Sequence, residues 1–431
     1  MDLSRSFAPL RHRQFALLWA GAFTSNIGTW METVAVGVLV TTATGEAGWA
    51  GLVAAAGFLP NAVLGPLGGA LADRVPRRRL LLITTTVQTA LAALLTVLTA
   101  MGTPHPGVVT LIVLASGCSM AIGFPSYQAL LPDLVPRDDL PGAIALSSAQ
   151  WNLGRVIGPA LAGIMIGVGG YEWAFAFNTV SFLAVIAVLL ALRLPRPVPT
   201  AEASIIEAIR AGARFVRADA GLRVVVGYMA LNSLLAAPFI ALVPAFALKV
   251  FDNERAGTAA LVTAQGVGAV LMGLALGTLH ARFGGRRVLL GVLWGLPAAL
   301  CAYALAPNLL VGVVAIFVVG FLYLGALSSF TTIAQLRAPG HLRGRVMSVL
   351  MVTLGTLYPL GSVLQGEIAD VVGLRATTAG AAIVMVGALL AVRLVRPDVA
   401  HALDSPADEV PADGVPAATV SPDLTPLPPR A

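Results

Sequence analysis

Long apolar stretches alternate with short polar segments along almost the whole chain. Most stretches are about 20 residues or longer, enough for an α-helix to cross the hydrocarbon core of a bilayer. The pattern therefore predicts an all-α integral membrane protein with twelve transmembrane helices. The expected spans are 15–40, 48–72, 79–101, 108–131, 142–168, 173–193, 223–248, 257–280, 288–306, 309–335, 346–369 and 374–394.

One short pattern occurs twice, at 69–79 and 277–287. Each copy reads Gly-x-Leu-x-x-Arg, ends in a cluster of arginines and separates one span from the next. The copies lie 208 residues apart, the same offset that separates the starts of the first and seventh spans. A second loop repeat, 136–142 and 339–344, supports the same division. Duplicated six-helix halves are typical of secondary transporters.

The repeats and the loop composition predict the domain organisation. We expect an N-terminal six-helix bundle over 1–194 and a C-terminal six-helix bundle over 223–395. The central loop, 195–222, alternates isoleucines and phenylalanine with charged residues, which favours a short interfacial helix. The tail, 396–431, is rich in proline and acidic residues, so we expect it to be disordered.

Composition excludes a soluble protein. Hydrophobic residues make up 57% of the chain and charged residues only 11%, against roughly 25% charged in a soluble domain. The net charge of +6 does not indicate nucleic-acid binding, because the arginines occupy short loops beside apolar spans. Alternate loops and the termini carry 23 of the 27 basic residues, and the opposite loops carry three. This bias predicts that both termini lie in the cytoplasm. Only one of the 27 basic residues is lysine, which is typical of GC-rich bacterial genes, so we expect a bacterial plasma (inner) membrane.

With the twelve spans, the duplicated hairpin and the long central loop, residues 10–395 resemble the major facilitator superfamily. Three local stretches, 7–30, 152–163 and 342–348, are most similar to one branch of it. This is the exporter branch that includes enterobactin-type siderophore exporters and macrolide efflux proteins. The resemblance implies two pseudo-symmetric six-helix bundles, a small-molecule substrate and transport by alternating access.

The resemblance also implies a gate at the cytoplasmic ends of the helices. A carboxylate at a helix C-terminus is disfavoured by the helix dipole, and in the family its partner is the start of the eleventh helix. In the first hairpin copy this carboxylate is Asp73, at the end of the second span, and the second copy has Ala281 in its place. We therefore expect the first copy to be the stronger gate. The gating residues expected are Gly69, Asp73, Arg74, Arg77, Arg78, Gly277, Arg282, Arg286, Gly344 and Arg345.

The fifth predicted span contains a small-residue pattern that resembles the antiporter motif of the family. Its members are Gly154, Gly158, Pro159 and Gly163. Small residues four apart permit close helix contact, and a proline kinks the helix. In the family this pattern seals the interface with the eighth helix; generic helix packing is the alternative.

Two charged residues, Glu32 and Arg155, fall deep within predicted spans. Charges at such depth are costly and usually face a cavity or a partner. Glu32 is the best candidate for a proton carrier, because a buried carboxyl group can alternate between charged and neutral forms. The alternative is that Glu32 is structural, paired with Arg155 or with a neighbouring helix. Glu367 and Asp370, near the outer end of the eleventh span, are expected at the interface.

Polar and aromatic residues on several spans would line a central cavity in this fold. With few charges among them, they suit an amphipathic or aromatic compound. The candidates are Asn26, Trp30, Tyr127, Gln128, Asn152, Asn232, Gln265, Tyr323, Ser328, Thr332 and Tyr358.

The leading functional hypothesis is a secondary exporter of a drug, siderophore or secreted metabolite, energised by the proton gradient and without a cofactor or metal. No nucleotide-binding glycine loop or catalytic motif indicates an enzyme or an ATP-driven pump. The expected partners are the substrate, protons and lipid, with a monomeric chain and no nucleic acid. An uptake permease for a small nutrient and a transporter-like membrane sensor remain as alternatives.

Overall fold

The computed structural model describes residues 7–192, 205–253, 255–339, 342–395 and 402–403. Within these ranges the side chains of Asp73, Asn152, Arg255 and 205–209 are not described. The loop residues 195–204 and nearly all of the predicted tail therefore lie outside the description. Every regular element in the described ranges is helical.

Twelve helical segments in these ranges are long and apolar enough to cross a membrane, which confirms the predicted spans. The first half begins with the short helix η1 (Ala8–Arg11) and carries the turn η2 (Arg137–Asp139). Its spans are α2 (Arg13–Thr44), α3 (Ala47–Arg74), α4 (Arg77–Met101), α5 (Pro106–Leu134), α6 (Leu140–Gly169) and α7 (Tyr171–Ala191).

The second half begins after α8 (Ile205–Ala218), the helix expected in the central loop. Its first span consists of α9 (Ala220–Leu231), the π-turn η3 (Asn232–Ala236) and α10 (Phe239–Lys249). The others are α11 (Arg255–Phe283), α12 (Gly285–Ala304), α13 (Leu309–Arg337), α14 (Arg343–Val372) and α15 (Leu374–Val395).

The seventh span was predicted as one continuous helix, and the structure shows it to be broken. Pro238 has no N–H to donate to the carbonyl of Leu234, so the α-helical ladder stops there. The side chain of Gln365 in α14 donates instead to the carbonyls of Leu234 and Leu235, at 3.0 Å each. A π-turn is therefore tolerated at this depth because a neighbouring helix satisfies its free carbonyls.

The two hairpin copies turn differently. In the first, Pro76 precedes α4 with a φ of −51°, a value its ring enforces. In the second, Gly284 precedes α12 with a φ of +80°, which favours glycine. The duplication therefore preserved the position of the turn but not its backbone conformation.

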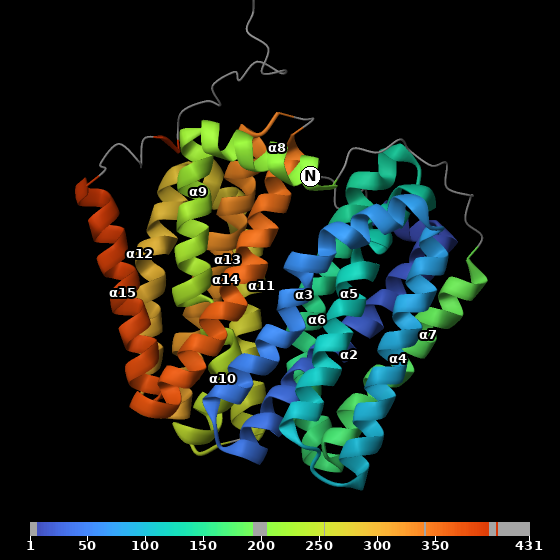
Figure 1. Ribbon diagram of the computed structural model, residues 1–431, viewed down its shortest axis with the longest axis horizontal. Helices are drawn as coiled ribbons and strands as arrows, with labels where there is room; N and C mark the ends of the chain where they lie inside the picture. Colours follow the sequence, from blue (N-terminus) through green and yellow to red (C-terminus); the bar gives the residue numbers. More distant parts are fainter. Residues whose placement is uncertain (1–6, 193–204, 254, 340–341, 396–401, 404–431) are drawn as a thin grey trace, which may run out of the picture.

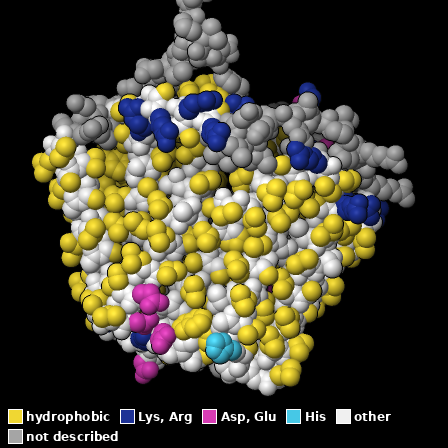
Figure 2. Space-filling view, viewed as in Figure 1, with side chains coloured by type: hydrophobic (Ala, Val, Ile, Leu, Met, Phe, Trp, Pro, Cys, Tyr) yellow, Lys and Arg dark blue, Asp and Glu magenta, His cyan; other side chains and the backbone are white. Residues whose placement is uncertain are grey.

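The helices form two groups, α2–α7 and α9–α15, with α8 lying across one end (Figure 1). The groups meet where α3 packs along α14 and α6 packs along α11. We call the end that carries α8, the 74–77 turn and Arg345 the basic end. We call the opposite end, with Glu46, Glu367 and Asp370, the acidic end. Figure 2 shows basic side chains gathered at the first and acidic ones at the second, with apolar side chains over the flank between them.

The core of the second half is one continuous cluster, whereas that of the first half is two. One of these includes Phe15 and Leu131 toward the basic end, and the other includes Met31 and Phe175 toward the acidic end. Between them, along α2, α4, α5 and α6, polar residues interrupt the apolar packing. This interruption is where the structure places its cavity.

Candidate functional site

A cavity of about 1520 Å³ lies between the halves. All six spans of the first half line it, while the described part of the second half contributes the stretch of α14 from Gly344 to Gly355. Arg74 and Arg345 at the basic end belong to the lining, so the cavity extends to that end. Its size suits a whole drug-sized molecule.

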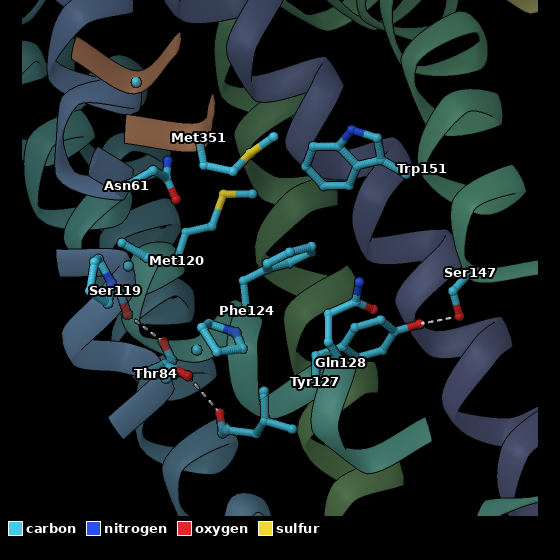
Figure 3. A pocket seen from close by; sticks show the side chains of 18 of the residues that line it. Asn61, Thr84, Ser119, Met120, Phe124, Tyr127, Gln128, Ser147, Trp151 and Met351 are labelled. Carbon is cyan, nitrogen blue, oxygen red and sulfur yellow. Dashed lines mark hydrogen bonds between the residues drawn. The ribbon is translucent and has the colours of Figure 1, made fainter. Parts of the chain in front are cut away.

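The wall of this cavity is aromatic, sulfur-containing and weakly polar (Figure 3). Ser119 donates from its hydroxyl to the carbonyl of Thr84 at 2.9 Å, and Gln150 donates from its amide nitrogen to the hydroxyl of Tyr127. The other labelled side chains are Asn61, Met120, Phe124, Gln128, Ser147, Trp151 and Met351. Among the described lining side chains no carboxylate occurs, and such a wall suits an amphipathic or aromatic compound.

The predicted cavity residues divide into three groups. Asn26, Tyr127 and Gln128 line the large cavity, and Trp30 and Gln265 line a smaller one nearby. The following line neither: Asn232, Tyr323, Ser328, Thr332 and Tyr358. The side chain of Asn152 lies outside the description. The prediction assumed equal walls from both halves, but α9, α10 and α13 are packed into the core of the second half.

Sequence reasoning missed the contribution of α3 and, on α14, chose Tyr358 instead of the stretch that lines the cavity. Phe58 and Asn61 on α3 and Met347, Ser348 and Met351 on α14 all line the cavity. A signal was present in α3, where Gly65, Pro66, Gly69 and Ala70 recur on the lining. Small residues at helical spacing leave one face of a helix open, but they predict close packing equally well.

Glu32 and Arg155 do not form an ion pair, but Glu32 does bond to a neighbouring helix, which was the other form of the structural alternative. Asn178 in α7 donates from its side-chain nitrogen to Oε2 of Glu32 at 2.7 Å, and the hydroxyl of Ser181 donates to Oδ1 of Asn178 at 3.1 Å. Glu32 is thus held between α2 and α7. The guanidinium of Arg155 instead lies over the ring of Trp30, 5.5 Å from its centroid.

At the basic end the predicted gate is parted. A Cβ added at Gly69 or Gly344 would meet no atom within 4 Å, although both glycines line the cavity. Arg77 donates to the carbonyl of Ala129 and to the carboxylate of Asp133, at 2.9 and 2.7 Å, within the first half. α3 and α14 are therefore separated here, and the side chain of Asp73 is outside the description.

The other predicted gating residues also lie within their own halves. Arg78 donates to the carbonyl of Leu190 at 2.6 Å. In the second copy, Arg282 lies over the ring of Phe283, 5.3 Å from its centroid, Gly277 has open space beside it and Arg286 is half-buried. The contacts of Arg78 and Arg282 thus stay within one half each.

The acidic end is closed. A Cβ at Gly51 would overlap the carbonyl of Ser362 in α14, and one at Gly366 would lie 2.9 Å from the carbonyl of Ala47. The backbones of α3 and α14 thus approach closely because both have glycines at the crossing.

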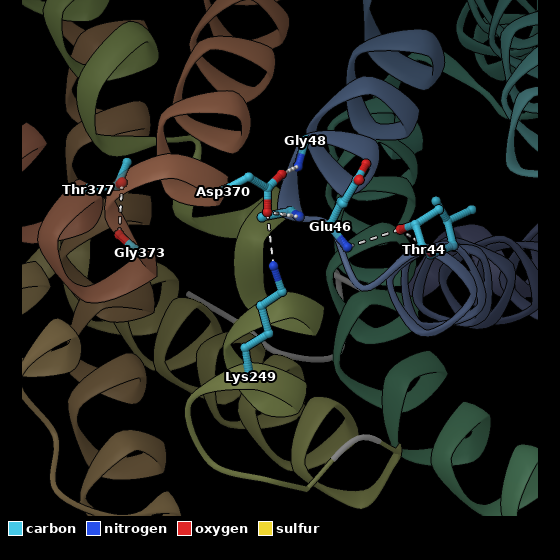
Figure 4. A network of polar contacts seen from close by, with 9 residues as sticks. Thr44, Glu46, Gly48, Lys249, Asp370, Gly373 and Thr377 are labelled. Carbon is cyan, nitrogen blue, oxygen red and sulfur yellow. Dashed lines mark hydrogen bonds and ion pairs between the residues drawn. The ribbon is translucent and has the colours of Figure 1, made fainter.

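Asp370 of α14 stabilises the closed acidic end through hydrogen bonds to α3 and α10 (Figure 4). The backbone N–H groups of Ala47 and Gly48 donate to Oδ1 and Oδ2 of Asp370 at 2.8 and 2.7 Å. Lys249 of α10 donates to Oδ1 at 2.9 Å. A carboxylate at a helix N-terminus satisfies free N–H groups and complements the dipole of α3. Asp370 was expected only at the interface, and no sequence signal showed its partner.

The small residues of α6 face two different helices. A Cβ at Gly154 would lie 3.1 Å from Cβ of Asn26, and one at Gly158 would lie 2.6 Å from Cβ of Trp30, both in α2. Gly163 instead faces Ala259 of α11. Pro159 lies inside α6 between these contacts. The pattern therefore packs α6 within its own half as well as against the other half.

Weakening the bond to Asp370 should open the acidic end. In a chain lacking Cys118 and Cys301 and carrying Ala47→Cys, we expect Asp370→Asn to raise the rate of labelling by a maleimide about tenfold or more. The reason is that hydrogen bonds to a charged group contribute ~1.5–3 kcal/mol. Glu46→Gln, which removes a neighbouring exposed charge, is the control. Equal labelling of the Asp370→Asn and Glu46→Gln proteins would contradict this role.

Twelve spans, two packed halves and a large cavity between them agree with the family comparison, which identifies a membrane transporter of the major facilitator class. The chain belongs to the transmembrane secretion effector family, whose model matches residues 4–426.

Two relatives and one solved structure illustrate the likeness. The multidrug efflux pump Tap of Mycolicibacterium fortuitum is 29% identical over 84% of this chain and 90% of its own length. The staphyloferrin A transporter of Staphylococcus aureus is 27% identical over 83% and 90%. A bacterial homologue of the human lysosomal transporter Spinster, in an inward-facing and unoccupied conformation, shares the fold. Its TM-score is 0.68 at 15% identity, over 92% of this chain and 98% of that one.

Proposed function

We propose that this protein exports small amphipathic compounds across a bacterial plasma membrane by alternating access. The observation that carries the proposal is a single large cavity that reaches the basic end while the acidic end is closed. Since arginine-rich ends face the cytoplasm, the cavity is open to the cytoplasm in this conformation. The names of the efflux relatives favour export over uptake.

The moving bodies in this proposal are the two halves, 1–194 and 223–395, acting within one monomer. The contacts between them concentrate on two helix pairs, α3 with α14 and α6 with α11. Asp370 and the glycines close the acidic end, and Gly69, Asp73 and Gly344 would close the basic end in the opposite state. Both closures join α3 to α14, one at each end of this helix pair. In alternating access one end is closed while the other is open.

Glu32 is the proposed proton carrier. It is a carboxyl group held deep between α2 and α7, bonded to the neutral amide of Asn178 and to no basic residue among the described ones. Protonation removes its charge without breaking an ion pair. The turn of α2 before it carries Asn26 and Thr29 on the cavity wall, so a shift of α2 would connect the two sites.

Export is tested by the energy-dependent loss of fluorescent dyes and antibiotics from cells with and without the gene. We expect cells with the gene to retain less compound, and a protonophore to abolish the difference. Greater retention would favour the uptake permease, and unchanged retention of every compound would favour the sensor.

Glu32→Gln should separate exchange from energised transport. In liposomes, the variant should lose accumulation driven by a proton gradient while keeping the exchange of labelled for unlabelled dye, because glutamine fills the same space but cannot carry a proton. Glu172→Gln, in the first turn of α7, is the matched control. If Glu32→Gln retains gradient-driven accumulation, another residue carries the proton.

A further inference from the structure

A second, much smaller cavity of about 50 Å³ lies between the halves, next to the large one. Helices α2 and α6 of the first half and α10 and α11 of the second line it. Its polar lining residues are Trp30, Thr33, Arg155, Thr258 and Gln265. This volume exceeds that of one water molecule but cannot contain a drug-sized compound, so it fits one functional group of a larger molecule.

Three hydrogen-bond donors at this cavity have no acceptor among the described residues. Nε1 of Trp30 and Nε2 of Gln265 are buried and unpartnered, and the side chain of Gln265 is 1% exposed. The guanidinium of Arg155 has the ring of Trp30 beneath it, and no described residue accepts a hydrogen bond from it or pairs with it. The guanidinium is half-buried, whereas each of the two buried nitrogens without a partner costs ~1–3 kcal/mol, so the arrangement is complete only with an acceptor.

The charge around this cavity is positive. Tyr323 and Tyr358 carry phenols that interact electrostatically with Arg155. Glu32, two residues after Trp30 in α2, bonds to Asn178. Arg155 is half-buried within a span. An arginine at such depth normally has an anionic partner, and no described carboxylate forms an ion pair with it.

A pair of tryptophans lies between the small cavity and the large one: Trp30 lines the small cavity and Trp151 lines the large one. Trp30 and Trp151 meet edge to face, with ring centroids 5.7 Å apart. Trp151 lines the large cavity together with Thr29, the residue before Trp30. An aromatic body in the large cavity can therefore lie against Trp151 while a group attached to it reaches Arg155.

We propose that Arg155, Gln265 and Trp30 form a subsite for an anionic group, a carboxylate or another oxyanion, on the transported compound. This rests on the proposed function in one respect, that the ligand is the compound transported. The planar guanidinium suits an oxyanion because it donates two parallel hydrogen bonds. Since Arg155 belongs to α6 and Gln265 to α11, an anion bound to both joins the two halves.

Binding of a matched pair of probes to the purified full-length protein tests the subsite. The probes are 2-naphthoate and 2-naphthamide, which share their aromatic body and differ in charge, and the readout is equilibrium dialysis. We expect naphthoate to bind roughly tenfold more tightly or better, because charge-assisted hydrogen bonds are about twice as strong as neutral ones. Equal affinity of the wild-type protein for the two probes would overturn the proposal.

Four single substitutions show which residue causes the preference for naphthoate over naphthamide. Arg155→Gln should bring naphthoate binding down to that of naphthamide, Arg155→Lys should keep part of the preference, and Gln265→Leu should reduce it. Arg79→Gln, which removes an exposed arginine at the start of α4, should leave the ratio unchanged. A preference retained in Arg155→Gln, or lost in Arg79→Gln, would place anion recognition elsewhere. If Arg155→Gln fails to fold, the wild-type ratio and Gln265→Leu still decide.

These measurements need neither a proton gradient nor a direction of transport. A chain that turned out to import its substrate, or to use another ion, would still show the preference for naphthoate. Conversely, export of dyes with no preference between the probes would refute the anionic subsite alone.

Discussion

Valine in place of Gly51 is expected to abolish transport by holding the acidic end open. Any Cβ at this position overlaps the carbonyl of Ser362, and a backbone atom cannot move aside as a flexible side chain can. Overpacking costs typically ~1–3 kcal/mol, which lowers the population of the closed state about tenfold or more. Dye efflux should fall accordingly, and the Ala47→Cys reporter should become reactive to a maleimide.

A glycine-to-valine substitution at the other end of α3, near the basic end, provides the matched comparison. Gly69 has open space beside it in this conformation, so Gly69→Val fits here and obstructs only the opposite closure. Transport should again fall, but the Ala47→Cys reporter should stay protected. Gly291→Val, also with open space beside it, should transport normally. A Gly51→Val protein that transports at the wild-type rate would exclude this crossing as part of the cycle.

Asparagine in place of Asp219 should cause the largest loss of stability. Asp219 accepts from the N–H of Leu222 at 2.7 Å, which caps α9. It also pairs with Arg337 through two hydrogen bonds of 2.9 and 3.0 Å. Asp219 is 2% exposed and Arg337 is 7% exposed. Neutralising the carboxylate removes the buried charge that pairs with the guanidinium and weakens both hydrogen bonds, at a cost of ~3–5 kcal/mol.

Thermal denaturation of the purified protein measures this cost, and the midpoint should fall by at least ~5 °C. Asp138→Asn, an exposed acid in η2, should denature as the wild type does. Adding Arg337→Met to Asp219→Asn should recover part of the loss, because the buried guanidinium is then gone. If Asp219→Asn and Asp138→Asn denature at the same temperature, the pair does not stabilise the fold.

The fold was largely predictable from the sequence because each span satisfies its own backbone. A helix in lipid needs only an apolar run of sufficient length, and charged or helix-breaking residues mark where it ends. The predicted span 374–394 matches α15, which ends at Val395, and 79–101 matches α4, which begins at Arg77. In the seventh span Pro238 marks the irregular turn in the sequence, but the residue that satisfies the freed carbonyls, Gln365, belongs to another helix.

The candidate site was less predictable because its walls are unequal. Choosing polar residues on corresponding helices of the two halves identified Asn26 and Tyr127 in the first half. The same reasoning placed Asn232 and Thr332 of the second half in the cavity, where the structure does not have them. A sequence duplication predicts similar helices, but the rotation of each helix about its axis depends on packing against its neighbours.

The number of spans, their pairing into two related halves and the separation of arginines to one end all follow from the amino-acid sequence. These properties depend on runs of residues and on their transfer into lipid, one span at a time. Helix packing in three dimensions was needed to show that Asp370 caps α3, that Glu32 bonds to Asn178 and that Arg155 lies over Trp30. Each of these contacts joins residues more than a hundred positions apart, so each depends on how tilted helices pack together.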